Sequence, residues 1–309
     1  MSSGRLANLL IVGVPKAGTT SLFGYLIQHP DICGSDVKEI GYFNYFHPLH
    51  NPDDRLPPIE TYRAHFAHCT GQRYALEATP SYSYGGQEVI DGIRQLLGEP
   101  KAIITLRNPT DRLWSAYTFQ RSLGNITTIK SFDEYLNVCE LRRRDGTDRK
   151  ATSHLQGLAI GFYADYLSAW LDAFGEDLRV VFAEDMAREP TRVLEELFGW
   201  LDIDASGVSN LNMGARNVTA HARNPRVAKL MYSLKRGGDR LGLLPPVVRE
   251  PFRRAYLRLN TGSLPERMDP AARRRVDRIY QDSNRATAHA LTDHGYTELP
   301  TWLESALGD

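Results

Sequence analysis

Residues 13–21 combine a lysine, two threonines, a serine and two glycines in one short segment that could bind an anion. The apolar run of residues 9–14 leads into it, and the sequence Pro-Lys-Ala-Gly stands before an amphipathic stretch. This order is typical of a buried strand, a tight turn and the first turn of a helix. Backbone N–H groups and the positive end of the helix dipole would then point at a bound phosphate.

The spacing of the glycines tests whether this segment is a nucleotide-kinase loop, which requires G-x-x-x-x-G-K-[ST]. Gly13 and Gly18 have the required spacing, but Thr19 occupies the lysine position and Lys16 lies within the turn itself. The segment therefore fails the kinase test. A purely structural glycine turn before a helix has the same pattern, so a second motif is needed.

Residues 101–117, KAIITLRNPTDRLWSAY, are a second segment in which a strand end meets a helix. The apolar residues 102–106 predict a buried strand, which Asn-Pro breaks before an amphipathic helix. Arg107 and Ser115 could clamp one phosphate from two sides, because a guanidinium forms a bidentate fork on phosphate oxygens. Alone, a strand-end arginine is often satisfied by a carboxylate.

Together the two motifs resemble those of sulfotransferases that use PAPS (3′-phosphoadenosine 5′-phosphosulfate). P-K-A-G-T-T-S-L is similar to the 5′-phosphosulfate loop of that family, and R-N-P-x-x-R-L-x-S-x-Y is similar to its 3′-phosphate motif. The resemblance implies that Lys16 contacts the bridging oxygen of PAPS and that Arg107 and Ser115 bind the 3′-phosphate. It implies that the 5′-phosphate is held by the loop residues Ala17, Gly18, Thr19, Thr20 and Ser21.

A third segment, KEIGYF at residues 38–43, resembles the K-E-x-x-[YF]-F of the carbohydrate-type branch of this family. The resemblance makes Glu39 the candidate general base, because a carboxylate within reach can take the proton of a hydroxyl acceptor. The alternative is a surface carboxylate paired with Lys38 or Lys16.

A fourth segment, EATPSY at residues 77–82, resembles the E-[KA]-[ST]-P-x-Y of the same branch. Ala78 stands where some heparan sulfate enzymes carry a lysine, which argues against a heparan-type acceptor. Residues 42–66 are rich in aromatic residues, histidine and proline, and we expect them to shape the acceptor site.

Two polar segments could lie over the bound donor. Residues 142–154 are basic and predict either a solvated loop or a lid for an anionic ligand. Residues 212–224 contain Arg216 and Arg223, and in relatives a loop near this place closes over the 3′-phosphate. The sequence does not choose between the two arginines.

The composition indicates which binding partners and which cellular compartment to expect. The 309 residues carry 37 basic and 37 acidic side chains, so no global charge favours nucleic acid. Cys33, Cys69 and Cys139 are odd in number and lack metal-binding spacing, which predicts buried or unreactive thiols in a reducing compartment. The histidines show no pattern that would converge on a metal, so no metal is expected.

The N-terminal apolar run continues into the phosphate loop and is predicted to be a core strand, with no signal peptide or membrane anchor. No later stretch is long enough to span a bilayer. We therefore expect a cytoplasmic enzyme of the soluble bacterial type.

Predicted strands and helices alternate along the chain, which indicates an α/β fold with a P-loop-type central parallel sheet and helices on both faces. The predicted strand–helix pairs are 9–14 with 19–28, 101–106 with 110–121 and 179–183 with 190–201. Residues 73–78 predict a further strand, and residues 162–174 and 270–294 predict helices. We expect one sulfotransferase domain over residues 1–309, with the phosphosulfate loop at 13–21, the 3′-phosphate motif at 107–117 and a helical part at 212–309.

The predicted activity is transfer of a sulfuryl group from PAPS to a hydroxyl of a sugar, glycolipid or secondary metabolite, releasing PAP (3′-phosphoadenosine 5′-phosphate). Two alternatives stay open. One is a P-loop small-molecule kinase that uses ATP and Mg²⁺, and the other is a non-catalytic module that binds PAP or another nucleotide. The acceptor and the oligomeric state are not predictable from these motifs.

Overall fold

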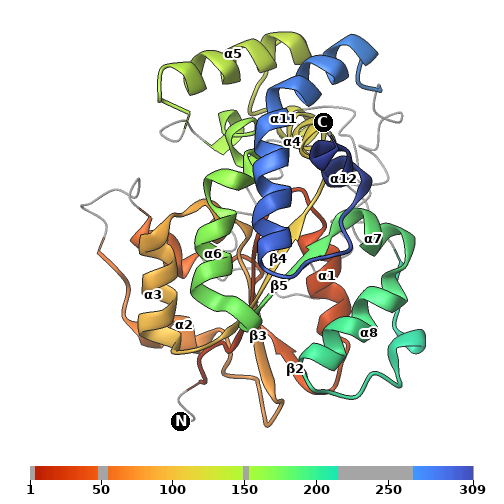
Figure 1. Cartoon of the computed structure of the whole chain (residues 1–309). Coiled ribbons are helices and arrows are strands. Elements are labelled where there is room, and N and C mark those ends of the chain that lie inside the picture. The colour runs from red at the N-terminus through yellow and green to blue at the C-terminus, as the bar shows by residue number, and fades with distance from the viewer. Residues whose placement is uncertain (1–3, 48–54, 149–152, 215–266, 309) are drawn as a thin grey trace. The chain divides into compact units, whose positions relative to one another are not determined.

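The computed structural model describes residues 4–47, 55–148, 153–214 and 267–308. The chain forms two compact units, one of residues 1–109, 162–216 and 279–309 and the other of residues 110–161 and 217–278. The first unit contains the central sheet (Figure 1).

Five parallel strands form this sheet, in the order β2-β3-β1-β4-β5. Their bounds are β1 Leu9–Gly13, β2 Ile32–Gly34, β3 Tyr74–Ala78, β4 Lys101–Leu106 and β5 Leu178–Phe182. Every residue of β1 and β3 is buried, as is typical of parallel strands covered on both faces. The predicted α/β fold with a parallel central sheet is therefore confirmed.

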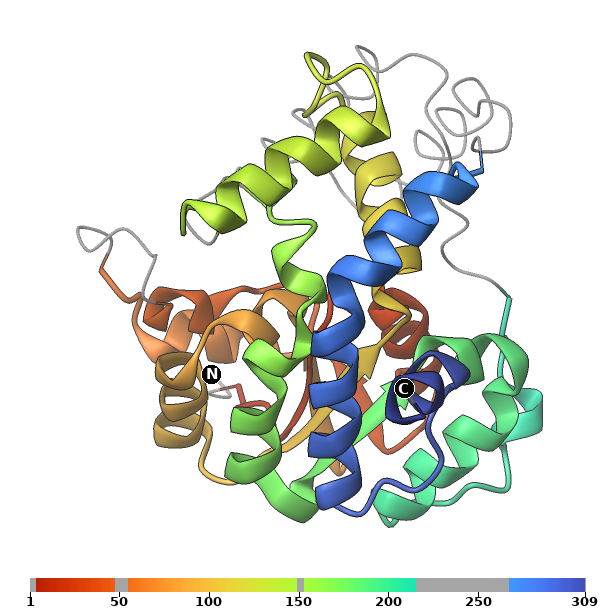
Figure 2. The ribbon, with the colours of Figure 1, turned by 45° about the horizontal axis from the view of Figure 1, so that its top comes forward.

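Helices cover both faces of the sheet. On one face α1 (Thr19–Leu26) and α8 (Pro190–Trp200) bury apolar side chains against β1 and β3. Figures 1 and 2 show α3 (Gln87–Leu97) and α6 (Leu167–Phe174) on the opposite face. Other elements of this unit include α2 Ile59–Ala64, α7 Ala183–Arg188, α12 Thr301–Leu307 and the 3-10 helices η1 Tyr42–Phe46 and η2 Pro80–Tyr84.

The second unit is helical in its described part. It contains α4 (Pro109–Ser122) from Thr110 onwards, α5 (Phe132–Arg144) and the first turns of α11 (Pro270–Asp293). Arg273 of α11 pairs with Asp111 of α4. The helix predicted over residues 270–294 is thus confirmed, and so is the helix predicted over 110–121.

The outer edge of the sheet at β5 is occupied by a side chain from the C-terminal segment. The Tyr296 hydroxyl accepts a hydrogen bond from the Val180 backbone N–H at 3.1 Å and donates to the Leu178 carbonyl at 3.4 Å. This hydroxyl therefore takes the place that a sixth strand would have beside β5.

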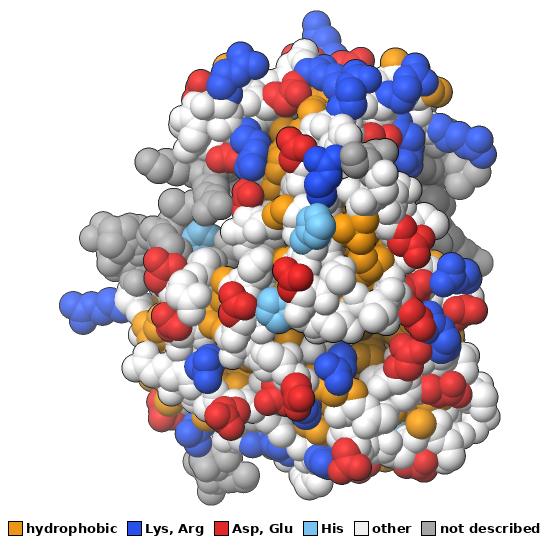
Figure 3. Space-filling view, in the orientation of Figure 1, with side chains coloured by type: hydrophobic (Ala, Val, Ile, Leu, Met, Phe, Trp, Pro, Cys, Tyr) orange, Lys and Arg blue, Asp and Glu red, His pale blue; other side chains and the backbone are white. Residues whose placement is uncertain are grey.

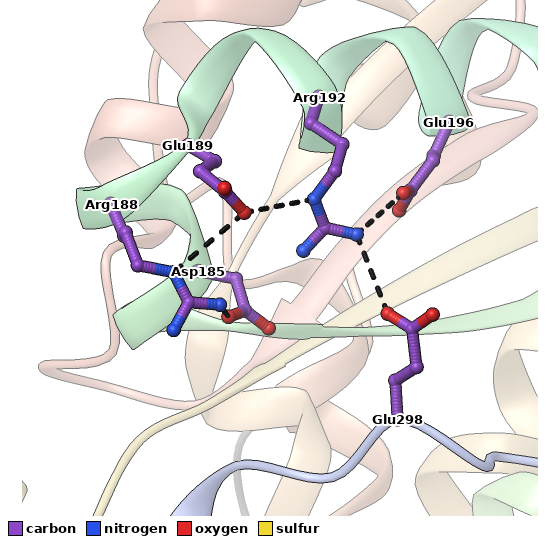
Figure 4. Close-up of polar contacts among 6 residues, drawn as sticks. All are labelled: Asp185, Arg188, Glu189, Arg192, Glu196 and Glu298. Carbon is purple, nitrogen blue, oxygen red and sulfur yellow. Dashed lines mark hydrogen bonds and ion pairs between the residues drawn. The ribbon is translucent and has the colours of Figure 1, made fainter.

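An ion-pair network follows α7 and α8 next to this edge (Figure 4). Arg192 pairs with Glu189, Glu196 and Glu298 at 3.0, 2.7 and 3.6 Å, which joins α8 to the C-terminal segment. These groups are partly exposed, so each pair contributes about 0–1 kcal/mol to the free energy of unfolding.

Cys33 of β2 and Cys69 form a disulfide, with their Cα atoms 5.8 Å apart. The prediction of unreactive thiols is therefore wrong for these two cysteines, because folding brings together residues 36 positions apart in sequence. Cys139 is a buried thiol, as predicted. None of the helices in the described ranges combines the length and hydropathy that a membrane crossing requires.

Candidate active site

The segment between β1 and α1 forms the tight turn that the sequence predicts. The Ala17 N–H donates to the Val14 carbonyl at 3.2 Å, and the backbone is left-handed at Lys16 (φ 72°) and Gly18 (φ 88°). Gly18 is the N-cap residue of α1, and no side-chain hydrogen bond caps the helix there. The start of α1 therefore presents N–H groups and the positive helix end beside Lys16, an arrangement that binds anions.

The two glycines of this loop have different structural roles. A Cβ atom at Gly13 would lie 2.3 Å from the Cβ of Ser83, so this position makes room for η2. At Gly18 a Cβ would meet only Met186, at 3.7 Å, but the positive φ disfavours any residue with a side chain. The glycine spacing that resembles a kinase loop thus reflects packing at Gly13 and backbone conformation at Gly18.

The structure brings the phosphate loop and Arg107 together. Arg107 follows β4, the neighbour of β1, and its Nη1 donates to the Lys16 carbonyl at 3.3 Å. From β1 the chain crosses to β2 on one side of the sheet, and from β4 it continues to β5 on the other. The carboxyl ends of two such strands form the crevice where ligands bind in open α/β sheets.

Two residues hold the backbone of the Arg107 turn, and sequence reasoning missed both roles. The Tyr163 hydroxyl donates to the Arg107 carbonyl at 2.6 Å. The Asn108 N–H donates to Glu184 Oε1 at 2.7 Å, and Glu184 lies in the first turn of α7, which follows β5. The sequence signal for Glu184 was an acidic residue after a predicted strand, and the signal for Tyr163 was its position off the centre of the apolar stripe of residues 162–174.

Glu39 lies at the same edge of the sheet. Its N–H donates to the carbonyl of Ala78 at 3.1 Å, at the end of β3, and β3 pairs with β1. The Glu39 side chain is 59% exposed and accepts an ion-pair hydrogen bond from Lys38 Nζ at 3.1 Å. The carboxylate is thus accessible to an acceptor, and its pairing with Lys38 is the one that the alternative interpretation expects.

Glu77, in the middle of a strand, is completely buried. It accepts hydrogen bonds from Tyr62, Thr79 and Tyr82 at 2.7, 2.8 and 2.6 Å. Burial raises the pKa of the Glu77 carboxyl, and the hydrogen bonds from Tyr82, Tyr62 and Thr79 oppose that rise. The signal in the sequence was a glutamate inside the apolar strand YALEA.

Four aromatic residues of the expected acceptor wall, residues 42–66, belong to the core, whereas the other described residues of this range are partly or fully exposed. Tyr42, Phe43, Tyr62 and Phe66 are buried, and the rings of Phe43 and Tyr62 lie 5.5 Å apart between centroids. These aromatic side chains pack on each other, so the expectation that they line a site is wrong for these four.

The other predicted ligands are not brought to this site by the described structure. Ser115 lies on α4 in the second unit, so its pairing with Arg107 stays a prediction. Arg216 and Arg223 fall outside the described residues. The basic segment 142–154 begins inside α5, which extends to Arg144, and its residues 149–152 are also outside the described part.

A cavity of about 340 Å³ lies beside β5. Arg179, Arg192 and Tyr296 line it, and the predicted site residues that the structure describes do not. Because Arg192 is already surrounded by three carboxylates, this cavity does not suit a phosphate.

Comparison with known proteins agrees with the motifs. The family model described as "Sulfotransferase domain" matches residues 6–288. Human bifunctional heparan sulfate N-deacetylase/N-sulfotransferase 1 is 26% identical over 311 residues, which cover 98% of this chain and 31% of that protein. The corresponding Caenorhabditis briggsae protein is 26% identical over 210 residues, which cover 65% of this chain and 23% of that protein. This chain therefore spans under a third of the length of these relatives.

A solved structure shows the same fold. The crystal structure of a sulfotransferase from Alicyclobacillus acidocaldarius superposes with a TM-score of 0.69 at 22% identity, covering 96% of this chain and 99% of that one. The parallel strand order and the family match over residues 6–288 lead to one conclusion. The chain belongs to the sulfotransferase domain family.

Proposed function

We propose that this chain transfers a sulfuryl group from PAPS to a hydroxyl of a sugar, a glycolipid or a secondary metabolite and releases PAP. The observation that carries the proposal is the hydrogen bond from Arg107 to the Lys16 carbonyl, because it joins the two predicted donor motifs. Family membership supports sulfuryl transfer and disfavours the kinase alternative.

In the proposed step the acceptor oxygen attacks sulfur, and the bond between sulfur and the bridging oxygen of PAPS breaks. Negative charge grows on the bridging oxygen, where the Lys16 ammonium stabilises it. Residues 17–21 hold the 5′-phosphate, and Glu39 takes the proton that the acceptor loses. These groups all come from the protein, so EDTA is expected to leave the rate unchanged, whereas kinase chemistry requires a metal between phosphates.

The backbone supports the choice of Lys16 and Glu39. Among the described residues, Lys16, Glu39 and Asp202 are the non-glycine residues with positive φ. Such a conformation costs on the order of 1–3 kcal/mol and is found preferentially at functional sites. Two of the three residues are the ones proposed to act on the reacting groups.

The donor assignment is tested by calorimetry. PAP is expected to bind more tightly than ADP, because Arg107 adds a ligand for the 3′-phosphate, with Ser115 and either Arg216 or Arg223 proposed as further ligands. Arg107→Ala should remove most of this preference, and Arg94→Ala, at an exposed position of α3, should leave it unchanged. Equal affinities for PAP and ADP in the unchanged protein would refute the 3′-phosphate assignment.

The acceptor side is tested by turnover with labelled PAPS and a panel of hydroxyl acceptors. Amino sugars belong in the panel because the relatives include N-sulfotransferases. Glu39→Gln should lower turnover by about 10²–10⁴ while PAP affinity is kept, since only the proton acceptor is lost. Glu60→Gln, an exposed glutamate of α2, is the matched control. An active Glu39→Gln together with an inactive His47→Ala would move the base to a histidine and the acceptor towards phenols.

The cytoplasmic location also stays a proposal, and the Cys33–Cys69 disulfide weighs against it, because disulfides are rare in reducing compartments. Alkylation of thiols in intact cells before lysis, followed by mass spectrometry, shows whether these two cysteines are oxidised where the protein resides.

A further inference from the structure

We propose that Glu77 is a positioning residue, whose carboxylate holds the backbone of residues 39–43 through the hydroxyls of Thr79 and Tyr82. The proposal rests on the proposed role of Glu39, and it adds a set of residues that would set the place of that carboxylate without touching the acceptor. We call Glu77, Thr79 and Tyr82 the hydroxyl relay.

The hydroxyl relay links two backbone N–H groups to the Glu77 carboxylate by hydrogen bonds. Thr79 Oγ1 accepts from the Gly41 N–H at 3.1 Å and donates to Glu77 Oε1 at 2.8 Å. The Tyr82 hydroxyl accepts from the Phe43 N–H at 3.2 Å and donates to the same oxygen at 2.6 Å. All three relay side chains are at most 2% exposed, so water does not compete for these bonds.

The direction of these hydrogen bonds explains why residue 77 is a carboxylate. Each hydroxyl uses a lone pair to accept from a backbone N–H, so its one proton is available for the hydrogen bond to Glu77. An ionised carboxylate only accepts hydrogen bonds, and the Glu77 carboxylate accepts one from each hydroxyl of Thr79, Tyr82 and Tyr62. In a glutamine at this position one carboxylate oxygen would become an N–H₂ group, which cannot accept from a hydroxyl. An amide therefore does not replace the carboxylate.

The relay fixes the segment on both sides of a strained turn. The N–H groups of Glu39, Gly41 and Phe43 bond to Ala78, Thr79 and Tyr82 in turn. Glu39 and Gly41 both have left-handed backbone, with φ of 70° and 73°. A non-glycine residue keeps such a conformation only where its surroundings impose it. The direction of the Glu39 side chain therefore depends on bonds that end at Glu77.

Tyr62 provides a matched control for the relay. Its hydroxyl donates to Glu77 Oε2 at 2.7 Å, as Tyr82 does to Oε1, and both rings are fully buried. The Tyr62 hydroxyl differs from that of Tyr82 in one respect. It bonds to Glu77, whereas the N–H groups of Gly41 and Phe43 bond to Thr79 and Tyr82. A purely structural role for the buried carboxylate predicts equal effects of Tyr62→Phe and Tyr82→Phe.

The experiment compares Tyr82→Phe with Tyr62→Phe, and Thr79→Ala with Thr79→Ser, which keeps the hydroxyl. Tyr82→Phe and Thr79→Ala should lower kcat by about 10–100-fold at unchanged PAP affinity, because a small displacement of a reacting group has effects of this size. Tyr62→Phe and Thr79→Ser should stay within about threefold of the unchanged enzyme. Amide hydrogen exchange should become faster at Phe43 in Tyr82→Phe and at Gly41 in Thr79→Ala, and in neither control.

Hydrogen exchange separates this proposal from the proposed function. Unchanged exchange at Gly41 and Phe43 in the relay variants overturns the relay, whatever Glu39 does. Equal losses of kcat in Tyr62→Phe and Tyr82→Phe overturn the positioning role, as does normal turnover in Tyr82→Phe when Glu39→Gln is inactive. An active Glu39→Gln refutes the proposed base, and the exchange rates then still decide whether the relay holds residues 39–43. If Tyr82→Phe does not fold, the Thr79 pair gives the same comparison.

Discussion

Lys16 combines a positive charge with a left-handed backbone, and substitutions can change these two properties separately. Lys16→Ala should lower turnover much more than it weakens PAP affinity, because the charge matters most as the bridging oxygen becomes anionic. Lys16→Arg should restore only part of the rate, since a guanidinium does not place a compact charge in the same tight turn. Turnover measured beside calorimetry of PAP binding checks both statements.

Lys16→Gly is the control for the backbone. Glycine removes the same charge as alanine but adopts the φ of 72° without steric cost. Its turnover should match that of Lys16→Ala, and its free energy of unfolding should exceed that of Lys16→Ala by about 1 kcal/mol. Near-normal turnover in both variants would place the lysine away from the reacting centre.

Cys139 should not react in the folded protein. Burial raises the pKa of its thiol to about 11, so at pH 8 the reactive thiolate is almost absent while the chain is folded. A thiol reagent should detect no cysteine in the native protein and one after unfolding without reductant. After unfolding with reductant it should detect all three. Three reactive cysteines in the unfolded, unreduced protein would contradict the disulfide.

The site residues predicted from sequence are those whose chemistry is encoded in a few consecutive positions. Lys16 and Gly18 lie in one turn, and Arg107 directly follows its strand. The hold of the relay on residues 39–43 was not predictable, because Thr79 accepts from Gly41 across 38 positions and Tyr82 accepts from Phe43 across 39 positions. Such pairs meet only once the chain has folded.

The disulfide closes the segment from Cys33 to Cys69 into a covalent loop that carries Glu39, η1 and α2. Loop closure over 36 positions limits the unfolded chain, and the entropy model gives about 4 kcal/mol of stability for it. Reduction should lower the free energy of unfolding by that order, as measured by urea denaturation with and without dithiothreitol. In the double variant Cys33→Ser/Cys69→Ser the reductant should have no effect. Equal stability of the oxidised and reduced forms would contradict the prediction.

The predicted elements were confirmed where a hydrophobic period ran over a whole strand or helix. The structure has β1, β3, β4, β5, α1, α4, α8 and α11 within a few residues of the predicted ranges. β2 was missed because three residues are too few to show a period. α3, which Gly86 and Gly98 bound, was missed although its buried residues Val89, Ile90 and Ile93 have the spacing of an amphipathic helix.

The two predicted donor motifs come together only through the order of the strands in the sheet. Chain order does not reveal that β4, the fourth strand in sequence, lies beside β1. Only this pairing brings Arg107 to the carbonyl of Lys16, although the two residues are 91 positions apart. The face of the molecule drawn in Figure 3 carries both acidic and basic side chains.

The hydroxyl of Tyr296 has a consequence for how copies of this protein meet. An open sheet edge is a template on which a strand of another molecule can pair, and such pairing leads to aggregation. By bonding to Val180 and Leu178, the hydroxyl blocks that template at β5. Tyr296→Phe keeps the ring and removes the block, so light scattering should rise at lower protein concentration than in the unchanged protein. Tyr25→Phe is the control, because it also removes one hydroxyl hydrogen bond to a carbonyl. It should leave the protein concentration at which scattering rises unchanged. An equal shift in Tyr25→Phe would mean that general destabilisation causes the aggregation. One phenolic oxygen that takes no part in the proposed reaction would then allow the enzyme to be more concentrated before it aggregates.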